Sequence, residues 1–313
     1  MDHNIVCRMY FGGFITWFLK NYGNNTSLVS INMYDTQVDY IGTKFKQFPN
    51  IIAGDFKNYD ADERGDVLWA LLEYIERFYE NSTFEDRLVR RILFYDLVNS
   101  RHICEDLVYE LVKSIPSGHP LTTVINTLYN LVLNVIIFLD LAPPEYRSIQ
   151  CYFDNVVPYF YGDDHIIGVS EHVKDWFNYA SFCNAYQYYG HVYTDSLKGS
   201  IEAERQFNKL EEVSILKRFI QYDHSLGRYI ARLSKITIEE IPNWVKKNGG
   251  VQATYDNIEE AVREASLWDE VYYLYIVCSL NKALKDSGLE PFPVEPWELK
   301  RRQVLASNCI LDS

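Results

Sequence analysis

The feature that most constrains the fold is a Gly-Asp-Asp turn between two apolar runs. Residues 156–161 (VVPYFY) and 165–169 (HIIGV) flank Gly162, Asp163 and Asp164. Apolar runs on both sides of a short Gly/Asp turn are typical of a β-hairpin, because these residues tolerate the backbone that reverses the chain. Aspartates in turns are usually structural, since they accept hydrogen bonds from their own backbone. A further carboxylate nearby would change that interpretation.

Such a carboxylate follows another short apolar run. Residues 51–54 (IIAG) predict a strand that ends at Asp55. Neighbouring strands of a small sheet would bring Asp55 beside the hairpin tip. Three carboxylates at one point repel each other unless a cation neutralises them, and oxygen ligands of this kind select Mg²⁺ or Mn²⁺. Asp60 stands three residues before Glu63, a spacing that also fits a helix N-cap.

The remaining patterns predict an α+β protein. Helices are predicted over residues 10–19, 67–78, 84–97, 122–141 and 172–184, a hairpin over 103–112, short strands over 192–194 and 213–216, and mostly helix from 219 onward. This order of elements fits a split βαβ sheet with helices on one face.

Composition narrows the class of function. The net charge is −13, and residues 51–200 carry 11 Lys and Arg against 22 Asp and Glu, which disfavours non-specific binding to duplex DNA. The sequence has no P-loop string and no C-x-x-C pair, and His165 and His172 lack partners at zinc spacing. The apolar run 128–142 is about 15 residues, too short for a bilayer of about 30 Å. It predicts a buried core helix, and no transmembrane segment is expected.

Five segments in a fixed order resemble the motifs of one family. They are residues 55–60 (DFKNYD), 116–126 (PSGHPLTTVIN), 161–164 (YGDD), 190–198 (GHVYTDSLK) and 214–219 (SILKRF). They resemble motifs A to E of the RNA-dependent RNA polymerases of positive-strand picorna-like viruses, of the picornavirus and dicistrovirus type. Residues 7–12 and 18–21 resemble the stretch before motif A. Five ordered motifs are specific, whereas YGDD alone is only suggestive.

The resemblance implies a right-hand polymerase fold. The palm, an RRM-like antiparallel sheet with helices, would cover residues 51–220, with a finger-side insertion near 98–115. Residues 1–50 would belong to incomplete fingers and 221–313 to a helical thumb. The resemblance covers only the C-terminal two-thirds of a typical polymerase, without the basic motif F. We therefore expect a part of a longer polyprotein, and the absent basic segment accounts for the acidic balance.

The resemblance also implies a metal site and a nucleotide site. Asp55, Asp163 and Asp164, with the carbonyl of Phe56, would hold Mg²⁺ or Mn²⁺. The residues implied in nucleotide binding are Asp60, Ser117, Gly118, Thr122 and Asn126. Of these, Asp60 with Ser117 and Asn126 would read the ribose 2′-hydroxyl, which both donates and accepts hydrogen bonds. Gly118 would let the template strand approach closely, and Thr122 would support Asp60 or the ribose. On its own, Asn126 would instead be interpreted as a solvent-facing or capping residue.

The last implied roles concern the leaving group and the primer. Lys198 would act as general acid for the departing pyrophosphate, although a solvated loop lysine fits nearly as well. Residues implied in RNA and primer binding are Tyr161, Gly162, Leu216, Lys217 and Arg218, the last two as phosphate contacts or, taken alone, ordinary surface charge. Motif B departs from the family at residues 119–121 (HPL), where smaller residues are usual, and Pro120 would stiffen this loop.

The sequence therefore predicts an enzyme that replicates a viral RNA genome by two-metal nucleotidyl transfer. The expected partners are RNA template and primer, nucleoside triphosphates, the upstream fingers of the same polyprotein and other viral replication proteins. The expected location is the host cytoplasm, at membrane-associated replication complexes. The alternatives are a reverse-transcriptase-type polymerase, a catalytically incompetent relic that only binds RNA or partners, and an acidic α+β domain without a metal site.

Overall fold

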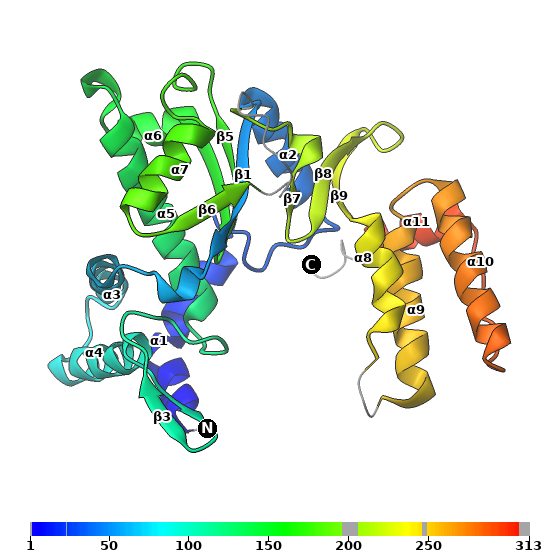
Figure 1. Cartoon of the computed structure of the whole chain (residues 1–313), viewed down its shortest axis with the longest axis horizontal. Helices are drawn as coiled ribbons and strands as arrows, with labels where there is room; N and C mark the ends of the chain where they lie inside the picture. Colours follow the sequence, from blue (N-terminus) through cyan, green and yellow to red (C-terminus); the bar gives the residue numbers. More distant parts are fainter. Residues whose placement is uncertain (1, 23, 196–205, 246–248, 307–313) are drawn as a thin grey trace. The chain divides into compact units, whose positions relative to one another are not determined.

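The computed structural model describes residues 2–22, 24–195, 206–245 and 249–306 (Figure 1). The chain divides into two compact units, the first formed by Met1–Ile31 and Lys44–Lys209, the second by Asn32–Thr43 and Leu210–Ser313. This division differs from the predicted three parts: residues 1–31 join the predicted palm, and motif E joins the C-terminal unit.

A four-stranded antiparallel sheet lies at the centre of the first unit, in the order β4–β5–β1–β6 (Figure 1). Its strands are β1 (Asn50–Lys57), β4 (Val156–Tyr161), β5 (Asp164–Val169) and β6 (Val192–Asp195). Strand β1 continues past residue 54, so Asp55 lies inside the strand and not at its end. The right-hand polymerase sheet that the sequence predicts is therefore present.

The predicted hairpin at residues 156–169 is confirmed, with a two-residue turn. Tyr161 pairs with Asp164, which leaves Gly162 and Asp163 as the turn. Gly162 has φ 62°, and a glycine with positive φ at the first turn position suits a tight hairpin because a side chain there would be strained. The turn places Asp163 at the exposed tip and Asp164 at the start of β5.

The first unit contains the helices α1 (Asp2–Lys20), α3 (Gly65–Phe78), α4 (Phe84–Val98), α5 (Thr122–Leu141), α6 (Ile149–Asn155) and α7 (Tyr179–Tyr188), with short 3₁₀ turns at Tyr59–Ala61 and Pro144–Tyr146. Helices α5, α6 and α7 pack against this sheet, whereas α1 and α3 pack against α4, and α3 also packs against α5. Helix α5 contributes a buried apolar face that packs against β4 and α7. The predicted hairpin near residues 103–112 is formed by β2 (Arg101–Cys104) and β3 (Leu107–Glu110).

Helix α5 also bears on the question of a membrane span. Its 20 residues exceed the 15 of the apolar run, and among the described residues it is the one helix long and apolar enough to cross a bilayer. However, 61% of its most apolar window is buried inside the protein, which is the behaviour of a core helix. The burial of α5, and not its length, therefore assigns this helix to the core.

Two predicted helices have wrong bounds, and one predicted cap is wrong. The helix predicted over residues 10–19 is α1, which begins at Asp2. The helix predicted over 172–184 begins only at Tyr179, because Asn178 caps it: the Asn178 side chain accepts from the Ser181 backbone N–H, and the Ser181 hydroxyl accepts from Asn178. The N-cap interpretation of Asp60 is also wrong, because α3 begins at Gly65 and Asp60 lies in the preceding 3₁₀ turn.

The second unit combines a small sheet with helices. Strands β7 (Ser214–Ile215), β8 (Arg218–Asp223) and β9 (Arg228–Leu233) form an antiparallel sheet, so the prediction of helix from residue 219 is wrong until residue 234. Helices follow at α8 (Lys235–Glu240), α9 (Gly250–Ala265), α10 (Glu270–Asp286) and α11 (Trp297–Ala306), with 3₁₀ turns at Leu210–Glu212 and Ile241–Asn243. Helix α2 (Gln37–Gln47) is divided between the two units after Thr43.

Candidate active site

The strand register brings the three predicted aspartates to one end of the sheet. Gly54 of β1 pairs with His165 of β5, so the next residue, Asp55, reaches the level of Asp164. Burial, then the charge of Asp163, then the charge of Asp55 raise the pKa of Asp164 to about 6. Asp163 and Asp55 therefore lie close enough to Asp164 for their charges to act on it.

The strand pairing around Asp55 depends on a glycine. A Cβ at Gly54 would lie 2.4 Å from the Thr194 carbonyl oxygen and 2.4 Å from the Tyr193 ring, so only glycine lets β1 pass this close to β6. The Thr194 hydroxyl donates to the Asp55 carbonyl oxygen at 3.1 Å. The Phe56 ring lies in the core against Tyr59, Tyr193 and others.

Side chains of helix α5 form hydrogen bonds with the Gly162–Asp163 turn. The Thr127 hydroxyl accepts from the Gly162 backbone N–H at 2.8 Å. The Asn130 amide donates to the carbonyl oxygens of Gly162 at 3.2 Å and Asp163 at 3.1 Å, and its own oxygen accepts from the Tyr186 hydroxyl at 3.3 Å. Buried amides with these bonds fix the turn that carries the catalytic candidates.

Sequence reasoning missed Thr127 and Asn130. The available signal was the recurrence of asparagine at positions 126, 130 and 134 in an otherwise apolar helix. This spacing puts the three amides on one helix face, and all three are buried. A polar stripe on a buried face needs partners, and here the partners of Asn126 and Asn130 belong to the site, whereas Asn134 accepts from the Tyr152 hydroxyl.

The same helix face orients Asp60. The Asn126 amide donates to Asp60 Oδ1 at 2.7 Å, and Asn126 is 5% exposed. The alternative of a solvent-facing Asn126 is therefore wrong. Burial raises the pKa of Asp60, the Asn126 hydrogen bond opposes this shift, and the charge of Asp163 adds to it. The predicted sugar-reading carboxylate and the hairpin aspartates thus belong to one electrostatic cluster.

A further acid, Glu63, lies beside Asp60. Glu63 is 3% exposed, and burial together with the Asp60 charge raises its pKa to about 9. At neutral pH it is therefore a neutral carboxylic acid. The sequence offered only its spacing from Asp60 as a signal, and that spacing was interpreted as a helix cap.

The motif B loop precedes α5. Ser117 and Gly118 are exposed, and Gly118 has φ 87°, a conformation that favours glycine. The Thr122 hydroxyl donates to the Pro116 carbonyl oxygen at 2.7 Å. In this structure Thr122 therefore supports the loop itself and not Asp60.

Motif E forms a tight turn in the second unit. Leu216 and Lys217 both have positive φ, 54° and 62°, between β7 and β8, and Lys217 is exposed. The Arg218 guanidinium is instead committed to Glu264, with its Nη1 at 2.9 Å from Oε2 and a second, shorter bond from Nη2 to Oε1. Glu264 is 1% exposed, so Arg218 neutralises a buried charge. Lys198 lies outside the described residues.

Comparisons with known proteins show the family of this chain. The family model for viral RNA-dependent RNA polymerase matches residues 1–285. The chain is 33% identical to the replicase polyprotein of Acute bee paralysis virus over 283 residues, which is 87% of this chain and 15% of that protein. It is 32% identical to the replicase polyprotein of Drosophila C virus over 278 residues, 84% of this chain and 16% of that protein.

A solved structure matches at the level of the fold. The Sicinivirus 3Dpol RNA-dependent RNA polymerase superposes with a TM-score of 0.79 at 18% identity, covering 96% of this chain and 60% of that chain. The fold and the aspartate cluster define a right-hand polymerase. The chain belongs to the viral RNA-dependent RNA polymerase family, and it spans about a sixth of the length of the curated polyproteins it matches.

Proposed function

We propose that this chain carries the catalytic core for template-directed RNA synthesis in viral genome replication. The reaction joins the 3′-hydroxyl of a primer to the α-phosphate of a nucleoside triphosphate and releases pyrophosphate. The observation that carries the proposal is the strand register, which brings Asp55 of β1 level with Asp164 of β5 beside the turn that holds Asp163. Motif A supplies Asp55 and motif C supplies Asp163 and Asp164, so three carboxylates come together only when both motifs lie in one sheet.

The donor set fits hard divalent cations. Asp55, Asp163, Asp164 and the Phe56 carbonyl offer oxygen atoms, which suit Mg²⁺ or Mn²⁺. A pair of such ions, when bound, stabilises the attacking and leaving oxygens of an in-line phosphoryl transfer. The residues themselves supply a negative pocket whose charge disfavours ionisation of Asp164, so the aspartates gain from a cation. The Asn130 clamp on the turn keeps Asp163 and Asp164 oriented.

Asp60 and Asn126 would select the sugar. Asn126 orients the Asp60 carboxylate, which can accept from a ribose 2′-hydroxyl. Exposed Ser117 would add a hydroxyl, Gly118 would leave room for the template strand, and Thr122 would hold the loop that carries both. The expected preference is for ribonucleotides, which separates this proposal from a reverse transcriptase.

Contacts to RNA would come from two turns. Tyr161 and Gly162 would meet the primer end at the hairpin, and exposed Lys217 beside Leu216 would contact a primer phosphate. Arg218 is not included, because its guanidinium pairs with buried Glu264. The family resemblance alone supports Lys198 as general acid for pyrophosphate.

The proposed setting follows the relatives, which are polyproteins. The chain would act with the upstream fingers of the same polyprotein and with other viral replication proteins. Its proposed place is the host cytoplasm, at membrane-associated replication complexes reached through those partners.

The test is extension of an annealed RNA primer on an RNA template with Mg²⁺ and ribonucleotides. We expect extension by this chain, or by this chain joined to its upstream reading frame, and none by Asp163→Ala. Incorporation of deoxynucleotides at the ribonucleotide rate would favour the reverse-transcriptase reading. RNA binding without extension in both forms would favour the catalytically incompetent relic.

A further inference from the structure

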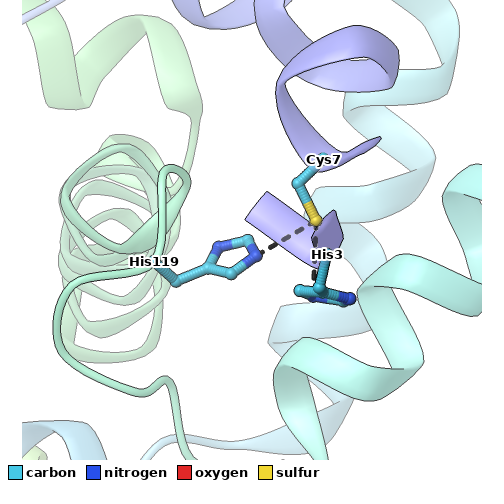
Figure 2. A group of neighbouring side chains, drawn as sticks. All are labelled: His3, Cys7 and His119. Atoms are coloured by element: carbon cyan, nitrogen blue, oxygen red, sulfur yellow. Dashed lines mark hydrogen bonds between the residues drawn. The ribbon is translucent and has the colours of Figure 1, made fainter. Parts of the chain in front are cut away.

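A cluster of two histidines and one cysteine lies away from the aspartates in the first unit. His3 and Cys7 are one turn apart on helix α1, and His119 belongs to the motif B loop (Figure 2). The Cys7 Sγ lies 3.4 Å from His3 Nε2 and 3.2 Å from His119 Nε2. Figure 2 shows both imidazoles directed at the same sulfur.

These separations are those of the ligands around one tetrahedral zinc ion. Bond lengths of about 2.3 Å to sulfur and 2.0–2.1 Å to nitrogen place ligand S and N atoms about 3.6 Å apart at tetrahedral angles. Among the described residues, this is the only group of three His, Cys, Asp or Glu ligand atoms that all lie within 4.8 Å of one another. The three aspartates of the active site are therefore more widely spread than this group.

We propose that His3, Cys7 and His119 bind one Zn²⁺ ion that fastens helix α1 to the motif B loop. Thiolate and imidazole are the ligands that zinc prefers, and the oxygen donors of the aspartate cluster select harder ions. This inference goes beyond the proposed polymerase activity, since the site shares no residue with it.

The surroundings of the Cys7 sulfur suit a metal site. Cys7 is fully buried among apolar residues of the core and forms no disulfide. A buried thiolate would be costly without a cation, and a bound zinc ion supplies one.

The fourth coordination position has room. A cavity of about 320 Å³ is bordered by His3 and His119 and also by Asp96, Ser117 and Gly118. A water molecule or the Asp96 carboxylate completes the tetrahedron from this side. The ion would then lie beneath the exposed Ser117–Gly118 segment and restrict its movement.

The competing explanation is a hydrogen-bonded cluster with no metal. The Leu121 backbone N–H donates to His119 Nδ1 at 3.2 Å, which leaves the ring proton on Nε2, facing Cys7. Zinc would displace that proton to Nδ1 and break the Leu121 bond. The loss of this single hydrogen bond is offset by the three metal–ligand bonds that zinc would form.

The test is metal binding by the whole chain, prepared without a polyhistidine tag and stripped with a chelator. We expect one Zn²⁺ per chain with a dissociation constant below about 1 µM. Co²⁺ in its place should give a thiolate-to-metal absorption band. Cys7→Ser should abolish that band, and His3→Gln should weaken zinc binding at least about 100-fold.

Two features keep the test decisive. His3 is exposed near the start of α1, so His3→Gln leaves the fold intact even where Cys7→Ser disturbs the core, and circular dichroism checks both. Cys151→Ser removes a partly exposed cysteine remote in sequence and should bind zinc like the original chain. Less than one equivalent of zinc, unchanged binding by His3→Gln, or equal loss in Cys151→Ser would overturn the proposal.

Discussion

The aspartate cluster and the His3–Cys7–His119 cluster lie in the same compact unit but are built from opposite chemistry. The aspartates are partly or fully exposed, charged and spread apart around a hairpin tip. The other cluster has a buried sulfur with two imidazoles at 3.2 and 3.4 Å. Carboxylates brought together repel each other unless a cation lies between them. The thiol and the two imidazoles of the second cluster, in contrast, already lie close together without an ion.

The largest expected effect comes from the charge at the hairpin tip. Asp163→Asn keeps the shape of the exposed side chain but removes its charge, so primer extension should fall about 10³-fold or more, since several kcal/mol of transition-state stabilisation is lost. Thermal stability should stay within about 0.5 kcal/mol. Glu145→Gln, at another exposed acid, is the control, and a mutant with normal extension would contradict the assigned role.

The second effect separates the two clusters by ion. Zinc at 100 times its dissociation constant should stabilise the chain by about 2.7 kcal/mol, which raises the melting temperature by about 5–10 °C for a unit of this size. Mg²⁺ at millimolar concentration should give no comparable shift. Differential scanning fluorimetry of the original chain and Cys7→Ser measures this, and an equal zinc shift in both would contradict it.

The third effect tests the clamp beneath the turn. Asn130→Leu leaves two turn carbonyls and the Tyr186 hydroxyl without their partner, which should cost about 1–3 kcal/mol of stability and also lower primer extension. Asn134→Leu is the matched control, because it removes a buried bond to Tyr152 on the same helix without touching the turn. Equal extension by the two variants would show that the clamp is only structural.

A smaller effect concerns sugar selection. Asn126→Ala removes the donor that orients Asp60, so discrimination between ribonucleotides and deoxynucleotides should fall about 10-fold, the value of one hydrogen bond of about 1.4 kcal/mol. Competition between the two nucleotide types in single-nucleotide extension measures it. Unchanged discrimination would remove Asn126 from the selection of sugar.

The last prediction concerns pH and Glu63. Its pKa is raised in the folded chain, so the folded state holds a proton that the unfolded state releases above its ordinary pKa of 4.5. The stability from this group is complete below pH 4.5 and is lost as pH rises toward about 9, at up to about 1.4 kcal/mol per pH unit. The free energy of unfolding, measured with denaturant between pH 5 and 9, should fall with pH in the original chain and lack this slope in Glu63→Gln. Equal slopes in the two proteins would contradict the prediction.

The sequence predicted the elements whose patterns are local. The apolar pattern of α5 predicted Thr122–Leu141, and the apolar runs around Gly162 predicted the hairpin. It misjudged residues 219–233 because charged residues such as Arg228 and Arg232 interrupt the apolar pattern of the strands β8 and β9. Arg232 pairs with Asp223 across this hairpin. Register, and so the position of Asp55 within its strand, depends on pairings that no local pattern reveals.

For the site, motif resemblance identified the aspartates but not their support. Thr127 and Asn130 act through bonds to backbone atoms of a turn about 35 residues away, which spacing within the helix cannot predict. The same limit applies to Arg218, whose partner Glu264 follows 46 residues later. The resemblance implied a phosphate contact for Arg218, but its guanidinium pairs with the buried Glu264 carboxylate instead.

Helix α5 has a consequence for how such an enzyme can change over generations. Asn126 and Asn130 are one turn apart, about 6 Å along the axis, and hold Asp60 and the Gly162–Asp163 turn respectively. With the roles proposed above, helix α5 positions the residues for both sugar selection and catalysis. A substitution at a buried apolar position such as Val124 or Leu133 would shift both together. Selection for greater accuracy would therefore act on helix α5, because the aspartates themselves are committed to the proposed metal site.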